Sequence, residues 1–246
     1  LTSCGTTILI DPVLEGNLDF GIPGIYDAAK RALPATGLVD TLPSLDALLI
    51  TQGLDDHSHT RTLRALAKRV PDLPVFAPPS ARPVIAPLFR NAKYITSNSR
   101  RLELPYLGLD GLPTIRLPAG SECDEVTIGG LSVRATSGAL VGPPWQRREN
   151  GYVIKPREAG GAPSLYIEPH VEFDPEELGQ LSGGVDVVVT PITGQGLPGF
   201  ELVHGPSASA DLVRRRVAPH SRSPSSSAPS RSTRCCCGRT PRATWA

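Results

Sequence analysis

The sequence predicts a mixed α/β (α+β) fold in which sheets stack on one another and helices cover them. Two observations lead to this prediction. The first hundred residues alternate short apolar strands with helical segments, whereas from residue 113 strands follow one another through tight turns. A chain of 246 residues, 39% of them hydrophobic, is also long enough to bury the core of one large domain.

The first half alternates the two kinds of element. Buried strands are expected over residues 6–14, 45–51 and 74–79. Residues 60–70 have the spacing of an amphipathic helix and end before Pro71. Shorter helices are expected over residues 26–33 and over residues 81–89, with Pro83 tolerated in the first turn of the latter.

The second half is richer in strands. Gly129 and Gly130 lie between two alternating segments and suit a hairpin turn. "DPEELGQL" predicts a short helix with an acidic first turn, and a largely apolar strand is expected over residues 185–193. "SADLVRRR" begins a further helix.

We expect one domain over residues 1–213 and a separate tail over residues 214–246. The domain carries 17 basic and 24 acidic residues, and the tail carries eight arginines and no acid. An acidic body gives no reason to expect nucleic-acid binding there. The tail is rich in Ser, Arg and Pro and contains "CCC". This composition suits a disordered segment, a basic arm for nucleic acid or a metal-binding cysteine cluster. Three adjacent cysteines, however, lack the spacing of zinc ligands.

Two further features concern targeting. No apolar run approaches the roughly 18 residues that span a bilayer, so no transmembrane segment is expected. The chain contains no methionine and begins at Leu1, so we expect a fragment or a processed form in which a targeting segment cannot be recognised.

The segment "ITQGLDDHSH", residues 50–59, directly follows an expected buried strand. It presents Asp55, Asp56, His57 and His59 where a strand opens into a loop. Such residues suit metal ligation, although Asp55 or Asp56 could equally cap the following helix.

The order of elements resembles the metallo-β-lactamase superfamily over about residues 5–213. A strand ending in "LIDP", the loop "LITQGLDDH", then "TSGALVGP" and "SLYIEPH" occur in the order of that family's motifs. The resemblance implies a four-layer αββα sandwich, and the tail suggests that its closing C-terminal elements are lacking. "GNLDFGIP", "LITQGLDDH" and "GPPWQRRENGY" resemble a plant, algal and cyanobacterial branch of hydrolase-like proteins.

The metal motif of that family, His-x-His-x-Asp-His, is altered in this chain. Gln52 and Leu54 occupy its first two histidine positions, whereas Asp56 and His57 match its end. Ala139 falls at the third-motif histidine, and no histidine occurs between Thr60 and Pro169. Because Leu cannot coordinate and neutral Gln is a poor zinc ligand, the resemblance implies that the first of two metal sites is lost.

The second site keeps more of its ligands. Glu168 falls near the family's bridging aspartate, and His170 would share a strand face with it. The resemblance implies one divalent ion, zinc or else iron or manganese, held by Asp56, His57, Glu168 and His170 or His204, with Asp56 also the catalytic candidate. The alternative is that no ion is held and that Asp56, His57 and Glu168 hydrogen-bond to one another.

"GPPWQRRENGY" is a dense polar and aromatic segment. Trp145 and Arg147 are candidates for binding the carboxylate or phosphate of a substrate. Alternatively, Trp145 closes the edge of the core while Glu149 and an arginine form an exposed ion pair.

Two functions remain open from the sequence. One is a metal-dependent hydrolase with a degenerate site and altered activity, in which an ion-bound water attacks an ester or amide. The other is a non-catalytic binding or assembly protein that keeps only the fold. The sequence identifies no small-molecule or protein partner and no compartment, and a chloroplast location is implied only by the branch resemblance.

Overall fold

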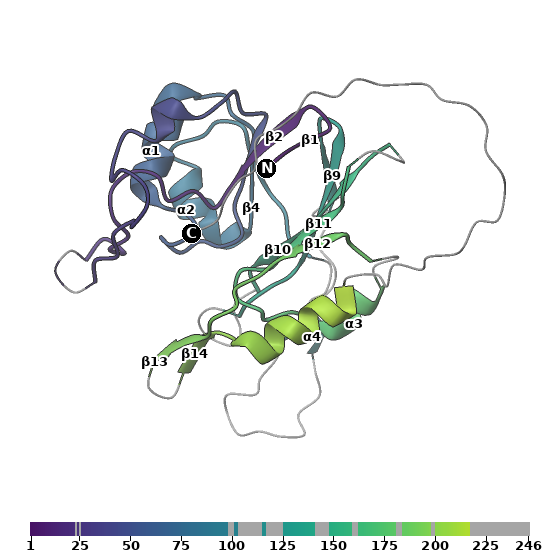
Figure 1. Cartoon of the computed structure of the whole chain (residues 1–246). Helices are drawn as coiled ribbons and strands as arrows, with labels where there is room; N and C mark the ends of the chain where they lie inside the picture. The colour runs from purple at the N-terminus through teal and green to yellow at the C-terminus, as the bar shows by residue number, and fades with distance from the viewer. Residues whose placement is uncertain are drawn as a thin grey trace, which may run out of the picture.

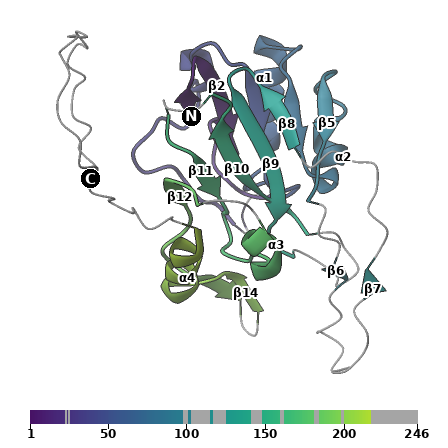
Figure 2. The ribbon, with the colours of Figure 1, turned by 90° about the vertical axis from the view of Figure 1, so that its right-hand side faces the viewer.

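Two five-stranded sheets lie face to face, and helices flank the outer side of each (Figures 1 and 2). The computed structural model describes residues 1–22, 24, 26–97, 101–102, 115–116, 125–140, 148–158, 162–180, 184–197 and 200–216. The expected tail therefore lies outside the described residues from residue 217 onwards, and residues 214–216 belong to a helix.

The first sheet has the order β1-β2-β3-β4-β5. Its strands are β1 (Thr2–Ser3), β2 (Thr6–Ile10), β3 (Ala47–Leu49), β4 (Val75–Ala77) and β5 (Ala92–Tyr94). The hairpin β1–β2 is antiparallel, and the other pairs are parallel. Helices α1 (Thr60–Arg69) and α2 (Arg82–Ile85) and the 3-10 turns η1 (Val39–Thr41) and η2 (Pro79–Ala81) lie in its connections.

The second sheet has the order β12-β11-β10-β9-β8. Its strands are β8 (Glu125–Ile128), β9 (Leu131–Ser137), β10 (Asn150–Pro156), β11 (Leu165–Ile167) and β12 (Val187–Val189). Only β12 runs parallel to its neighbour. The predicted turn at Gly129–Gly130 joins β8 to β9, and Gly129 has a φ of 54° there.

The remaining elements lie outside these sheets. Two small ribbons pair β6 (Arg101–Leu102) with β7 (Ile115–Arg116), and β13 (Gln195–Leu197) with β14 (Phe200–Val203). Helices α3 (Pro175–Gln180) and α4 (Pro206–Arg216) lie against the second sheet (Figure 1).

Three apolar clusters hold the layers together. The central cluster joins inward side chains of both sheets, such as Leu49 and Tyr152. A second cluster packs α1 and α2 on the first sheet through residues such as Leu63 and Ile85. A third joins α4 to the second sheet through Leu212. This arrangement confirms the predicted α/β (α+β) fold with its four αββα layers.

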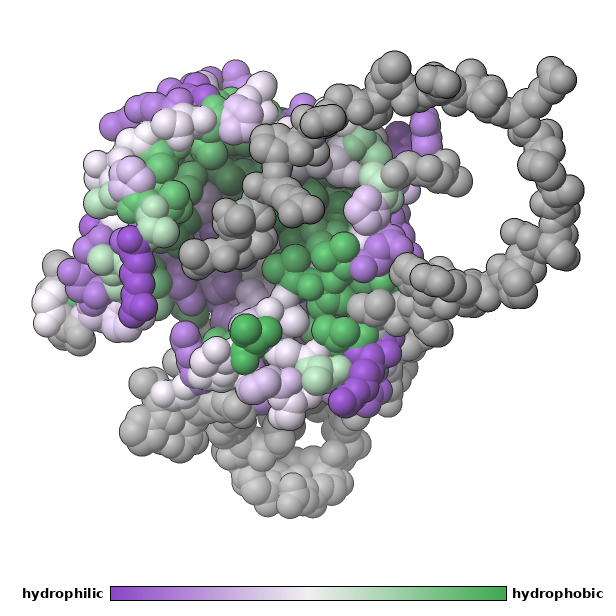
Figure 3. All heavy atoms as spheres, in the orientation of Figure 1, coloured by the Kyte–Doolittle hydropathy of each residue, from purple (hydrophilic) through white to green (hydrophobic). Residues whose placement is uncertain are grey.

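The outer strand β12 leaves apolar side chains at the surface. Val187 and Val189 are 42% and 50% exposed, and the nearby Ile192 is 78% exposed. Apolar surface is visible on this face of the molecule in Figure 3. Val188 instead packs on the third cluster, so successive residues of β12 alternate between two faces.

The helix expected over residues 26–33 is absent, and that prediction was wrong. Ala28 forms a bridge with Leu18, and the Lys30 ammonium donates to the carbonyls of Leu14, Gly16 and Ala35. These contacts provide hydrogen-bond donors for backbone carbonyl groups of an irregular segment. The helical spacing of residues 26–33 gives no indication of them. The helix expected over residues 81–89 is shortened to the four residues of α2. Among the described residues, no helix is long and apolar enough to cross a membrane.

Tyr152 links the two sheets beside the edge that carries the predicted site. Its side chain is fully buried, and its hydroxyl donates to the carbonyl of Ile50 at 2.7 Å. Asn150 Nδ2 donates to the same hydroxyl and to the Ile95 carbonyl, both at 2.9 Å. The end of β3 is therefore fixed from the opposite sheet.

We predict that Tyr152→Phe lowers the free energy of unfolding by about 1–3 kcal/mol, because it leaves the Ile50 carbonyl and an Asn150 amide hydrogen without a buried partner. Urea denaturation measures the change. Tyr26→Phe is the control, since Tyr26 is 49% exposed. Equal stability of the Tyr152→Phe variant and wild type would contradict the proposed link.

Candidate metal centre

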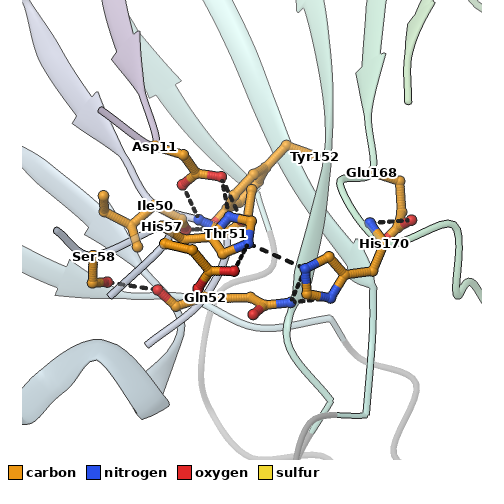
Figure 4. Close-up of polar contacts among 10 residues, drawn as sticks. Asp11, Ile50, Thr51, Gln52, His57, Ser58, Tyr152, Glu168 and His170 are labelled. Atoms are coloured by element: carbon orange, nitrogen blue, oxygen red, sulfur yellow. Dashed lines mark hydrogen bonds and ion pairs between the residues drawn. The ribbon is translucent and has the colours of Figure 1, made fainter. Parts of the chain in front are cut away.

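Several chain segments end together at one edge of the sandwich (Figure 4). Asp11 directly follows β2, and residues 51–59 follow the adjacent parallel strand β3. From the opposite sheet, the turn after β11 contributes Glu168 and His170. The packing of two sheets thus brings together side chains that are more than 100 residues apart in sequence.

Asp11 orients the ring of His57. Asp11 Oδ2 lies 2.9 Å from His57 Nδ1 and accepts a hydrogen bond from the Thr51 hydroxyl at 2.5 Å, while Oδ1 accepts from the Thr51 amide at 2.8 Å. Asp11 has a φ of 41°, a conformation that Asp tolerates better than most residues. With Nδ1 engaged in this way, His57 turns Nε2 toward the other candidate ligands.

Asp56, His57 and His170 converge. Each offers one ligand atom, and these atoms lie within 4.8 Å of one another. His57 Nε2 lies 3.2 Å from His170 Nε2 and 3.4 Å from Asp56 Oδ2. Both histidines are buried, whereas Asp56 is half-buried.

Gln52 contacts the second imidazole. Its amide nitrogen lies 2.7 Å from His170 Nδ1 and 3.4 Å from His170 Nε2. Gln52 is itself buried, and its backbone carbonyl accepts the Ser58 hydroxyl at 2.6 Å. Each histidine of the cluster therefore has a polar partner at Nδ1.

The charges of the cluster are strongly coupled. Burial alone would lower the pKa of His57, but hydrogen bonds to Asp11 and Asp56 raise it to about 10. Burial and the neighbouring positive charge of His57 lower the pKa of His170 to about 4. Burial also opposes ionisation of Asp56, yet its hydrogen bond to His57 keeps its pKa below the usual value. Without an ion, the cluster thus contains a charged His57 and a neutral His170.

Comparison with known proteins identifies the family. Residues 1–220 match the family model described as the beta-lactamase superfamily domain. The chain belongs to the beta-lactamase superfamily. No curated protein matches the chain by sequence.

Two solved structures share the superfamily fold. An isothiocyanate hydrolase from Delia radicum gut bacteria is 17% identical, with a TM-score of 0.53 over 87% of this chain and 76% of that one. A possible metal-dependent hydrolase from Veillonella parvula is 18% identical, with a TM-score of 0.56 over 88% of this chain and 77% of that one. At these identities the likeness establishes the fold alone.

The superfamily fold places three of the four predicted ligands together and the fourth apart. Glu168 is not in the Asp56–His57–His170 cluster; its Oε2 accepts from the amides of His170 and Glu172, both at 3.1 Å. Burial raises the pKa of Glu168 to about 8. In this position Glu168 fixes the turn that presents His170.

The other predicted residues have different surroundings. Leu54 is 43% exposed, and Ala139 is buried. His59 is buried, with Nδ1 2.8 Å from the Thr62 hydroxyl, and the amide of His204 donates to the carbonyl of His170. Neither histidine belongs to the cluster found among the described residues. Trp145 and Arg147 lie outside the described residues.

The spacing of the converging atoms suits a metal ion. A tetrahedral ion with bonds of about 2.0–2.1 Å needs ligand atoms roughly 3.3 Å apart, which is close to the 3.2 Å and 3.4 Å measured around His57 Nε2. Two imidazoles and a carboxylate are ligands that zinc, iron and manganese accept. Asp56 Oδ1 is also buried with no hydrogen-bond partner among the described residues. The residues present therefore fit a divalent ion.

The contacts of three residues at or near the site could not be predicted from the sequence. Asp11 lies in the recognised "LIDP" ending, but nothing in its spacing indicated contact with His57. Gln52 contacts His170, a role that its place in the altered motif does not indicate. Glu149 is buried and accepts hydrogen bonds from the Ser80 hydroxyl at 2.5 Å and from the amide of Gly53, so the expected exposed ion pair was wrong; the expected place of Trp145 at the core edge lies outside the described residues.

We predict a pH dependence from Glu149. Burial raises its pKa to about 7, against 4.5 for an ordinary glutamate. The folded state therefore binds more protons than the unfolded state between these values, and the free energy of unfolding falls as pH rises through that window.

Glu149→Gln, which resembles the protonated side chain, should reduce this fall when metal-free protein is denatured with urea at pH 5 and pH 8. The exposed Glu125→Gln is the control and should keep the wild-type difference. An unchanged pH dependence in Glu149→Gln would show that this carboxyl does not produce it.

Proposed function

We propose that the protein is a metal-dependent hydrolase of the beta-lactamase superfamily that works with one divalent ion, zinc or else iron or manganese. Asp56 Oδ2, His57 Nε2 and His170 Nε2 would hold the ion. The observation that carries the proposal is their convergence from both sheets, with each imidazole engaged at its other nitrogen. Histidine ligands of metal sites in proteins commonly have such outer partners.

The chain's own residues would give the ion a defined environment. Asp11 accepts a hydrogen bond from the Nδ1–H group of His57 and so leaves Nε2 free to bind. Glu168 holds the turn of His170 through two backbone amides. A bound divalent ion with an open position supplies Lewis acidity and activates water for hydrolysis of an ester or amide. Trp145 and Arg147 stay predicted substrate contacts.

The motif supports one ion rather than two. A second ion would need donors at the first two motif positions, where the chain has Gln52 and Leu54, and Leu54 has no atom that can coordinate. The activity we propose is therefore altered from that of a two-metal enzyme. The plant, algal and cyanobacterial branch and the chloroplast location stay predictions from the sequence.

One observation favours the alternative, a non-catalytic binding or assembly protein. His57 lies between the carboxylates of Asp11 and Asp56, at 2.9 Å and 3.4 Å, so a protonated ring already offsets one of their two negative charges without an ion. In that case the network would only stabilise the edge of the sandwich. A measurement of metal binding distinguishes the hydrolase from the non-catalytic alternative.

We predict that protein expressed with ample metal and then dialysed binds one divalent ion per chain and that His57→Ala loses it, because two of three ligands cannot hold the ion tightly. Elemental analysis and zinc titration calorimetry measure this. His204→Ala is the control, since His204 is outside the cluster. Absence of any ion from the wild-type protein, with no thermal shift on adding zinc, would contradict the hydrolase proposal.

We also predict hydrolytic activity that disappears on chelation and returns with the metal. A suitable panel contains nitrophenyl esters, an amide and an isothiocyanate, the last because one solved neighbour is an isothiocyanate hydrolase. Asp56→Asn should lower activity by at least tenfold at saturating zinc, because a neutral amide replaces the anionic ligand. Metal-loaded protein that hydrolyses none of the panel would favour the non-catalytic alternative.

A further inference from the structure

We propose that Gln52 is a positioning residue for His170: its side-chain carbonyl accepts the Nδ1 proton of that ring and keeps Nε2 directed at the ion. The inference rests on the proposed one-ion function. It assigns a role to the residue that occupies a ligand position of the family motif without being a good ligand.

The contact itself is close and shielded from water. Gln52 and His170 are 1% and 7% exposed. The Gln52 amide nitrogen lies 2.7 Å from Nδ1 and 3.4 Å from Nε2, and the Gln52 carbonyl oxygen is buried with no hydrogen-bond partner among the described residues. Figure 4 shows Gln52 extending from the β3 side toward the ring, beside the contact between His57 and His170. A buried hydrogen bond to a ring nitrogen decides which of the two nitrogens carries the proton.

The position of the proton on the His170 ring determines which atom of the Gln52 side-chain amide faces it. A histidine that binds an ion through Nε2 carries its proton on Nδ1, which then needs an acceptor. The amide nitrogen of Gln52 can only donate, whereas its carbonyl oxygen can accept. The two atoms exchange by a half-turn of the terminal torsion, and a ring protonated at Nδ1 requires the orientation with the oxygen toward it.

The backbone on both sides of this contact is fixed. The Gln52 carbonyl accepts the Ser58 hydroxyl, and at the next residue a Cβ on Gly53 would lie 2.6 Å from the Ser80 backbone. On the other side, Glu168 Oε2 accepts the His170 amide. The two side chains therefore meet from rigid supports, and His170 cannot turn without breaking its contact with Gln52.

The test compares zinc affinity in four proteins: wild type, Gln52→Leu, Gln52→Glu and Gln195→Leu. Gln52→Leu keeps much of the volume but has no acceptor, so zinc should bind about 10–100-fold more weakly. Gln52→Glu keeps an acceptor oxygen and should bind zinc at least as tightly as wild type. Gln195→Leu makes the same chemical change at an exposed residue of β13 and should leave the affinity unchanged.

A second readout separates positioning from ligation and from simple loss of packing. Nitrogen NMR of zinc-loaded wild-type protein should show His170 protonated at Nδ1. The cobalt(II) absorption spectrum of Gln52→Glu should match wild type, because the ligands are the same. Wild-type affinity in Gln52→Leu, affinity in Gln52→Glu as weak as in Gln52→Leu, or a shifted cobalt spectrum in Gln52→Glu would each overturn the inference.

Failure of the proposed function gives a different result. If wild-type protein binds no ion, the one-ion hydrolase is wrong, and the role of Gln52 is judged on metal-free protein. The His170 ring should then still carry its proton at Nδ1 in wild type, and Gln52→Leu should change that spectrum while Gln195→Leu does not. An unchanged His170 spectrum in Gln52→Leu would overturn the positioning role independently of the metal.

Discussion

The contact between Asp11 and His57 is the interaction on which the site depends. It joins the ends of two adjacent parallel strands, β2 and β3, at 2.9 Å. Thr51 binds both oxygens of the same carboxylate, so Asp11 is held at three points. Because Nδ1 of His57 is engaged there, Nε2 must face His170 and Asp56. Loss of this contact would leave the half-buried carboxylate with only its two Thr51 donors and would free the His57 ring to turn.

The second imidazole comes from the other sheet, and the packing of the sandwich sets its place. The turn after β11 is held by Glu168, and β10 fixes the end of β3 through Tyr152 and Asn150. The distance of 3.2 Å between the two Nε2 atoms therefore depends on how the two sheets pack against each other. This spacing suits either a shared proton or a divalent ion between the two Nε2 atoms. Without one of them, the lone pairs of the two nitrogens would repel each other.

Local sequence pattern predicted the layers and the loop well. The apolar run around residues 45–51 corresponds to β3, which is buried on both faces of its sheet. The helical spacing of residues 60–70 corresponds to α1, which buries one apolar face. The segment over residues 26–33 was predicted wrongly because the contacts of Lys30 with distant carbonyls outweigh its helical spacing. Asp56, His57 and His170 were identified as candidates from residue type and family resemblance.

The partners of those residues could not be predicted from the sequence. Asp11 and Gln52 reach the two histidines only through strand pairing and sheet packing, with separations of 46 and 118 residues. Alternation along a continuing strand placed Glu168 and His170 on one face, but the chain turns after β11, and Val171 has a φ of 59°. That turn directs the Glu168 carboxylate to backbone amides instead.

An anomalous-scattering map from crystals grown with zinc tests the central claim most directly. One peak should lie between Asp56, His57 Nε2 and His170 Nε2, with the His57 and Asp11 contact intact. No peak at this position, or two peaks in the site, would contradict a single ion held by these three side chains.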